Sequence, residues 1–423
     1  MGFETDEASS STLKIPGEDV PFLGQNQQLS SPSKTFANIF MSLVGAGVLG
    51  LPYTFKKTGW VMGPLLIISI ATLSYYCMML LVYSRRKLES QFEGAKISSF
   101  GDLGFAVCGP IGRFVVDVMI VLSQACFSVG YMIFIGNTLV YLFNSSVTEA
   151  NPRILGFSPK SVYIWSCFPF QLGLNSVPTL TLLAPLSIFA EIVDLGALGV
   201  VMVEDVLIYL KNRPSLEMFG GFSVFFYGLV VAVFAFEGMG LVLPLESETR
   251  DKNKFGKILG LSVAFVAILY GAFGALGYFA FGEETKDIIT TNFRQGSVSS
   301  LVQLGLCINL FLAFPLMMNP VYEVMERRFC EGRYCLCLRW LVVLTVCFVS
   351  LTVPNFADFM SLVGRSVSVV LGFVLPAFFH LIVFKDELGW YSLALDAAFI
   401  VMGTTFAVYG TSSSLAKIFS EMA

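Results

Sequence analysis

The sequence predicts an all-α integral membrane protein with eleven transmembrane helices. Of its 423 residues, 55% are hydrophobic and only 13% are charged, whereas a soluble chain carries roughly a quarter charged residues. Uncharged runs long enough to cross about 30 Å of hydrocarbon recur along the whole chain. Two of the predicted spans contain glycines and a proline near their centres, which predicts helices broken inside the membrane.

The predicted spans follow the uncharged runs in order. Residues 160–210 are long enough for two crossings of about 20 residues each, with Pro178 in the turn between them. Isolated charges interrupt two further spans, at Glu237 and at Arg365. The eleven predicted spans are 36–55, 61–84, 113–143, 160–177, 183–208, 221–244, 257–281, 298–324, 339–354, 357–383 and 388–412.

The loop charges predict the orientation of the chain. With the N-terminus in the cytosol, the cytosolic segments hold sixteen lysines and arginines and the far side holds nine, the bias that positive-inside topology requires. All four tryptophans, Trp60, Trp165, Trp340 and Trp390, fall near predicted span starts, where amphipathic rings anchor at the headgroup level. We therefore expect a cytosolic N-terminus.

The chain divides into tails and one membrane domain. Its first residues are rich in Ser, Gln, Gly and Pro and lack an apolar run, which predicts a disordered cytosolic tail. The expected organisation is a tail at 1–34, a transmembrane domain at 35–412 with a first repeat at about 35–210, a second repeat at about 215–384 and an eleventh helix at 388–412, and a short tail at 413–423.

Glycines in the first span match a nucleotide fingerprint only in spacing. Gly45, Gly47 and Gly50 are spaced as G-x-G-x-x-G, but the motif requires a preceding strand and an acidic residue about 20 positions later. Neither is present, so we favour a helix that breaks at these glycines and at Pro52. Freed backbone groups at membrane depth must line a cavity or be buried in protein; close helix packing at the glycines is the alternative.

The sixth span repeats this pattern. Gly238, Gly240 and Pro244 follow Glu237 within an otherwise apolar run. Interruptions at corresponding positions of two halves are typical of transporters built from inverted repeats, with the substrate site between the breaks. Spans one and six occupy corresponding positions if each repeat has five spans and the eleventh helix is extra. This pairing of interrupted spans favours a transporter over close helix packing alone.

Four stretches resemble a known family. Together they are similar to the amino acid/auxin permease superfamily and, within it, to the plant vacuolar neutral amino acid transporters, over residues 34–412. The resemblance implies a sodium-symporter-like fold with an inverted five-plus-five repeat, proton-linked movement of neutral amino acids and residence in the vacuolar membrane. At Arg365 the family pattern leads us to expect a small residue. The stretches are 36–60, 187–206, 234–248 and 362–384.

Two broken helices offer complementary groups to an amino acid. Exposed N–H groups at the first break would hold the carboxylate, and carbonyls at the second would hold the ammonium, with glycines allowing close approach. Polar residues of spans three and eight are candidates for the side-chain pocket, although polar residues that only join helices are an equal alternative. The expected substrate-binding residues are Gly45, Ala46, Gly47, Val48, Gly50, Phe236, Gly238, Gln124, Ser128, Tyr131 and Asn309.

Carboxylates inside the spans are the candidates for proton coupling. Glu237 comes first, because an ionisable side chain within a span is a functional hypothesis by default; its alternative role is to satisfy the unwound backbone. Asp194 ranks second and Glu191, three residues earlier on the same face of span five, is a further candidate. Glu204 and Asp205 are expected at the membrane boundary.

The sequence argues against an enzyme and against a cofactor or metal. With a single histidine, His380, it excludes hydrolytic triads and multi-histidine metal sites. We expect His380 to cap a helix or snorkel near the cytosolic end of span ten. The expected partners are a neutral amino acid, a proton and membrane lipids, with no nucleic acid. The expected transporter alternates access and moves substrate from the lumen to the cytosol; a plasma-membrane importer and a non-transporting amino acid sensor are the alternatives.

Overall fold

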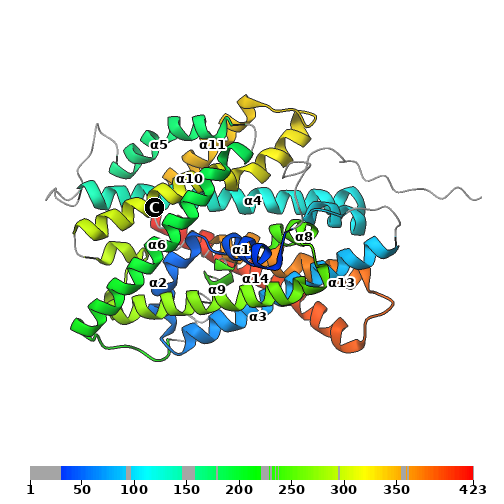
Figure 1. Cartoon of the computed structure of the whole chain (residues 1–423), viewed down its shortest axis with the longest axis horizontal. Coiled ribbons are helices and arrows are strands. Elements are labelled where there is room, and N and C mark those ends of the chain that lie inside the picture. Colours follow the sequence, from blue (N-terminus) through cyan, green and yellow to red (C-terminus); the bar gives the residue numbers. More distant parts are fainter. Residues whose placement is uncertain are drawn as a thin grey trace, which may run out of the picture.

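The computed structural model is helical and elongated (Figure 1). Among the described residues no strand occurs, six helices are long and apolar enough to cross a membrane, and a bent pair brings the number to seven. These lengths support an integral membrane protein. The structure describes residues 30–91, 97–144, 158–177, 180–220, 228, 231–233, 235–236, 238–293, 296–353, 359 and 362–422.

Helices occupy most of the predicted spans, and two stretches of the tenth are wound as π-helix, η4 and η5. Part of the sixth and tenth spans, including Glu237, lies outside the described residues. The elements are α1 (Pro32–Leu43), η1 (Ala46–Gly50), α2 (Leu51–Thr58), α3 (Met62–Gln91), α4 (Phe100–Asn144), α5 (Pro159–Asn175), α6 (Leu180–Asn212), α8 (Met239–Glu248), α9 (Lys252–Phe281), η2 (Gly282–Glu284), η3 (Ile289–Asn292), α10 (Ser297–Phe329), α11 (Leu336–Thr352), η4 (Gly364–Ser368), η5 (Val370–Val374), α13 (Leu375–Val383) and α14 (Trp390–Met422).

The first span bends where the glycines lie. Helix α1 ends at Leu43, and the helical segment from Gly47 to Thr58 leaves it at an angle of 51°. Pro52 sits in the first turn of α2, where its missing N–H would have no helical partner in any case. The backbone between the two helices therefore changes direction although neither helix has a proline beyond its first turn.

Two helix boundaries differ most from the predicted ones. Helix α4 begins at Phe100, but Gly109 has a φ of 64° before Pro110, so a short helix folds back on the span that follows. A Cβ at Gly112 would lie 2.1 Å from the carbonyl oxygen of Gly104, which shows how closely the two arms pass. Helix α14 continues to Met422, beyond the predicted end at residue 412.

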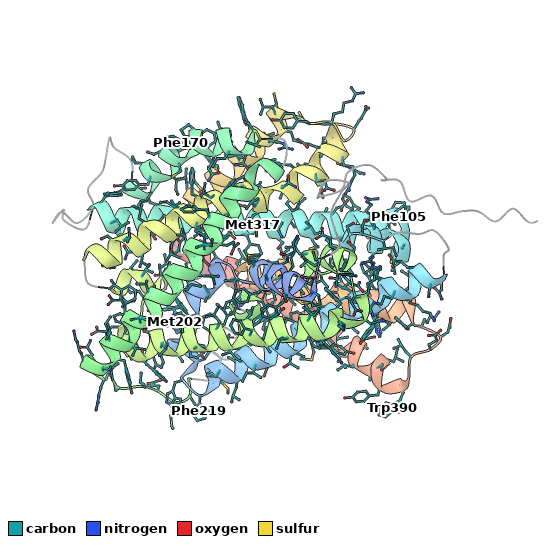
Figure 2. All side chains as sticks on the ribbon, in the orientation of Figure 1. Phe105, Phe170, Met202, Phe219, Met317 and Trp390 are labelled. Atoms are coloured by element: carbon teal, nitrogen blue, oxygen red, sulfur yellow. The ribbon has the colours of Figure 1, made fainter. Side chains whose placement is uncertain are left out.

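Long helices such as α3, α4 and α9 run roughly along the long axis of the molecule (Figure 1). In Figure 2, Phe105 and Trp390, from segments expected on the cytosolic side, lie towards one end of the molecule. Phe219, from a segment expected on the far side, lies towards the opposite end. Helix α9 packs against α1, α2, α3 and α6, and α10 packs against α4 and α6, so α6 contacts both groups of helices.

A buried ionic cluster joins α3 to α8. The Glu246 carboxylate accepts hydrogen bonds from Arg85 Nη1 at 3.3 Å and from Arg86 Nε at 2.7 Å, and Arg85 also donates to the carbonyl of Leu243. Glu246 and Arg85 are both almost fully buried. Helix α8, the second half of the sixth span, is thereby fixed to the end of α3.

The outer ends of α1 and α2 are also tied to neighbours. Ser30, just before α1, donates its N–H to the carbonyl of Glu248 at 2.8 Å and accepts from the N–H of Arg250. At the other end, the Lys56 ammonium donates to the carbonyls of Glu283 and Thr285 beyond α9. Each half of the bent span is thus attached to the second repeat.

The eleventh helix is attached to the tenth span by polar groups. Nδ1 of His380 lies 2.7 Å from Oδ2 of the buried Asp396, so the prediction that His380 caps or snorkels is wrong. The signal was missed because Asp396 belongs to another span. Arg365 runs alongside Gly410, where an added Cβ would lie 2.8 Å from the Arg365 Cδ atom; a glycine in α14 therefore makes room for this arginine.

Candidate functional site

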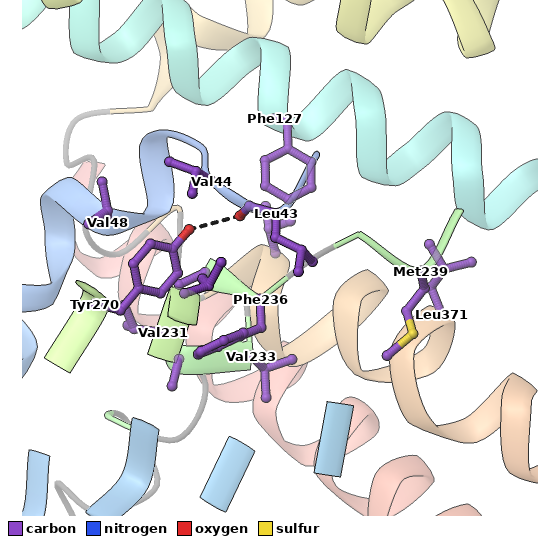
Figure 3. Packing of buried hydrophobic residues seen from close by; sticks show 14 of the residues in the cluster. Leu43, Val44, Val48, Phe127, Val231, Val233, Phe236, Met239, Tyr270 and Leu371 are labelled. Atoms are coloured by element: carbon purple, nitrogen blue, oxygen red, sulfur yellow. Dashed lines mark hydrogen bonds between the residues drawn. The ribbon is translucent and has the colours of Figure 1, made fainter. Parts of the chain in front are cut away.

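The bend of the first span carries a hydrogen bond from another helix. The hydroxyl of Tyr270, on α9, donates to the carbonyl of Leu43 at 2.8 Å (Figure 3). Both residues are buried. A tyrosine side chain thus satisfies a carbonyl at the end of α1, as buried backbone at membrane depth requires.

Gly238 and Gly45, two glycines at the site, have different surroundings. An added Cβ at Gly238 would lie 2.6 Å from Cδ2 of Leu43, so this glycine lets the start of α8 approach the end of α1. At Gly45 an added Cβ would meet no atom within 4 Å, and the backbone there is extended, with a φ of −153°. Packing therefore explains Gly238 but does not explain Gly45.

Aromatic rings surround the bend. Phe236 lies with its ring centroid 5.2 Å from that of Tyr270, at an interplanar angle of 63°. In Figure 3 the ring of Phe127 points from α4 towards Leu43. The hollow between α1 and α8 next to the bend, lined by Ser42, Leu43 and Gly238 among others, has no room for a water molecule. A substrate can enter this region only if these helices or rings move.

A buried acidic centre lies next to the bend. The carboxyl of Asp194, on α6, interacts with the side chain of Asn309, on α10. Tyr131 and Tyr270 both lie close enough to Asp194 and Glu191 for electrostatic interaction. Four helices, α4, α6, α9 and α10, therefore bring polar groups to one place, and Tyr270 connects that place to the end of α1.

The other residues predicted for the site divide into three groups. Ser128 is fully buried on α4, and its hydroxyl has no hydrogen-bond partner in the described structure. Gln124 is half-buried, and Gly47, Val48 and Gly50 are buried in the turn before α2. Glu237 and the side chain of Ala46 lie outside the described residues.

Sequence reasoning missed Tyr270 and Phe127. Tyr270 is the one hydroxyl-bearing aromatic in the middle of the predicted seventh span, and Tyr278 is the next along the helix. A buried tyrosine hydroxyl needs a partner, which could have marked Tyr270 as a polar position. Nothing in the sequence shows that its partner would be Leu43, 227 residues earlier.

Removal of the Tyr270 hydroxyl is expected to loosen the bend. Tyr270→Phe leaves the Leu43 carbonyl buried without its donor, at a cost of about 1–3 kcal/mol. We expect a lower midpoint of thermal unfolding in detergent and weaker substrate binding. Tyr278→Phe is the matched control on the same helix. The Tyr278 hydroxyl accepts a hydrogen bond from the N–H of Glu217 near the C-terminal end of α9, away from the bend. Equal effects of the two variants on binding would contradict a role for Tyr270 at the bend.

A bundle of apolar helices with a bent first span and buried polar groups beside the bend defines a membrane transporter. The chain belongs to the transmembrane amino acid transporter protein family, whose family model matches residues 28–416. This match confirms the family resemblance predicted from the sequence. It also means that the chain belongs with transporters and not with enzymes, as expected.

Relatives match the chain over most of its length. It is 61% identical to the amino acid transporter AVT3C of Arabidopsis thaliana, covering 99% of both chains, and 63% identical to AVT3B of the same plant, covering 96% of this chain and 98% of that relative. Vacuolar amino acid transporter 3 of Saccharomyces cerevisiae is 27% identical, over 94% of this chain and 58% of the yeast protein.

A solved structure shows the same fold class. The crystal structure of MhsT in complex with L-phenylalanine superposes with a TM-score of 0.53, at 13% identity, and covers 94% of this chain and 100% of that one. At this identity the likeness concerns the fold alone.

Proposed function

We propose that this chain is a proton-coupled transporter that moves small neutral amino acids from the vacuolar lumen to the cytosol by alternating access. The observation that carries the proposal is the bend of the first span, where open space beside Gly45 meets a buried carbonyl and a buried acidic centre. Backbone N–H groups at the bend suit a carboxylate, and nearby carbonyls suit an ammonium.

The proposed architecture has eleven spans, with repeats of five and one extra helix, and both the first and the sixth span broken. The 51° bend after α1 and the close approach of Gly238 to Leu43 support adjacent breaks in these two spans. In this arrangement the Gly45–Gly50 backbone, Phe236 and Gly238 bind the invariant part of the substrate. Ser128, Gln124 and Tyr131 face its side chain.

The proposed membrane is that of the vacuole, with the N-terminus in the cytosol. Relatives that carry the word vacuolar in their names support the membrane, and the excess of lysine and arginine on one side supports the orientation. In this orientation an acidic lumen supplies protons that leave with the substrate.

Proton coupling is proposed to involve Glu237 and the acidic centre of Asp194 and Glu191. Asp194 is buried and interacts with Asn309, so its protonation would change a contact between α6 and α10. A buried carboxylate that changes charge alters the balance between two packings of the helices around it.

The decisive experiment is uptake of labelled neutral amino acids into proteoliposomes, with and without an imposed pH gradient. Wild type should concentrate substrate only with the gradient. In Glu237→Gln or Asp194→Asn, gradient-driven accumulation should fall about 5- to 150-fold, the range of a typical coupling energy. Glu283→Gln, in the turn after α9, is the control. If wild type binds amino acids but never transports them, the sensor alternative replaces the proposal.

A further inference from the structure

Asp205, on α6, is a buried carboxylate that the proposed mechanism does not use. Its side chain is 0% exposed, and neither carboxylate oxygen has a hydrogen-bond partner in the described structure. An isolated carboxylate is costly to bury. Such residues within a span mark ion or proton pathways, so Asp205 requires a functional explanation.

Asp205 lies on the same face of α6 as Asp194. The buried positions of this helix include Asp194, Ala197, Leu198, Val201 and Asp205, which form one stripe at helical spacing. Eleven residues correspond to about three turns, so the two carboxylates lie about 16 Å apart along the helix. Between them the stripe is apolar, which separates two acidic positions instead of forming one cluster.

The position of Asp205 is near the end of the molecule expected in the lumen. One turn further along α6, the ring of Tyr209 lies 5.7 Å from that of Phe279, close to the C-terminal end of α9. Helix α6 ends at Asn212, and the segment that follows is expected on the far side. Asp205 is thus buried but only two turns from the end of its helix.

No charge of opposite sign is available from the helices that cover Asp205. Helix α9 has no charged residue from Ile258 to Phe281, and α10 has none from Ser297 to Tyr322. The titratable groups on these stretches are Tyr270, Tyr278, Cys307 and Tyr322. The charged residue that acts on Asp205 is its neighbour Glu204, of the same sign. The carboxyl of Asp205 is therefore suited to hold a proton and is not one half of an ion pair.

We propose that Asp205 is a proton-binding site near the luminal end of α6. It exchanges its proton with the lumen before the acidic centre at Asp194 is loaded. This inference rests on the proposed proton coupling and adds a second, outer position to it. The occupant is a proton, because a single carboxylate without further oxygen ligands does not form a cage for a metal cation.

Asp205→Asn separates this role from a structural one. The full-length protein in proteoliposomes is assayed for gradient-driven accumulation of neutral amino acids and for counterflow exchange at equal pH on both sides; its thermal midpoint is measured in detergent. We expect accumulation to fall about tenfold, within the usual range of a coupling energy, while exchange persists. The thermal midpoint should stay equal or rise, because an unpaired buried acid is removed.

Two further variants keep the test decisive. Asp205→Leu, which removes the carboxyl altogether, should behave as Asp205→Asn does, and Glu283→Gln, at an exposed position in the turn after α9, should accumulate substrate as wild type does. Wild-type accumulation in Asp205→Asn, or a parallel loss of exchange and accumulation, overturns the inference. If wild type shows no gradient-driven accumulation, the proposed function itself fails, and this is seen before any variant is compared.

Discussion

Replacement of Gly45 by valine is expected to abolish amino acid transport while the protein remains folded. The backbone at Gly45 is extended, a conformation that β-branched residues adopt readily, and an added Cβ meets no atom within 4 Å. Stability therefore gives no reason for a glycine. If the open space beside it receives the substrate, valine fills that space and blocks the approach of the substrate to the backbone.

The size of the effect should follow the size of the side chain. Gly45→Ala is expected to lower transport about tenfold or more, as a single methyl group in a fitted pocket does, and Gly45→Val to lower it further. The measurement is uptake into proteoliposomes together with the thermal midpoint. Gly199→Val is the control, because an added Cβ on this exposed face of α6 also meets no atom within 4 Å. Normal uptake by Gly45→Val would show that the substrate does not bind at the bend.

Glu246→Ala is expected to be the most destabilising of the changes considered. It removes one of the two counter-charges of the buried Arg85 and breaks the contact with Arg86; loss of one partner of a buried pair costs about 3–5 kcal/mol. Glu89 and the Leu243 carbonyl remain as partners of Arg85, so the lower end of the range is expected. The midpoint of thermal unfolding in detergent checks it.

An exposed ion pair provides the control for Glu246. Lys254 and Asp251 lie 2.9 Å apart with both side chains more than a third exposed, and such pairs contribute about 0–1 kcal/mol. Lys254→Ala should therefore leave the thermal midpoint almost unchanged. A midpoint of Glu246→Ala as high as that of Lys254→Ala would show that the cluster does not hold α8 to α3.

The sequence predicts those features whose cause is local. Gly45, Gly47, Gly50 and Pro52 disfavour a continuous helix through their own backbone chemistry. The structure bends between Leu43 and Gly47, whereas Gly50 and Pro52 lie within the helical segment that follows. The uncharged runs predict the helices for the same reason. The third span was predicted to begin at residue 113, so the fold-back at Gly109 and Pro110 was not predicted.

Contacts between distant segments could not be read from the chain. The hydrogen bond from Tyr270 to Leu43 and the interaction between Asn309 and Asp194 each join separate spans. Apolar periodicity shows that a helix is buried but not which helix covers it. The acidic residues of span five were therefore identified as candidates, whereas their association with Tyr131 and Tyr270 required the structure.

The two arms of the bent span are nearly equal in length, and this has a mechanical consequence. Helix α1 has 12 residues, and the helical segment from Gly47 to Thr58 has the same number, which gives arms of about 18 and 20 Å at 1.5 Å per residue of α-helix and about 2.0 Å per residue of 3-10 helix. A rotation about the bend therefore displaces both ends of the span about equally far. Because Ser30 pairs with the chain between α8 and α9 and Lys56 bonds to the carbonyls beyond α9, both displacements are transmitted to the second repeat.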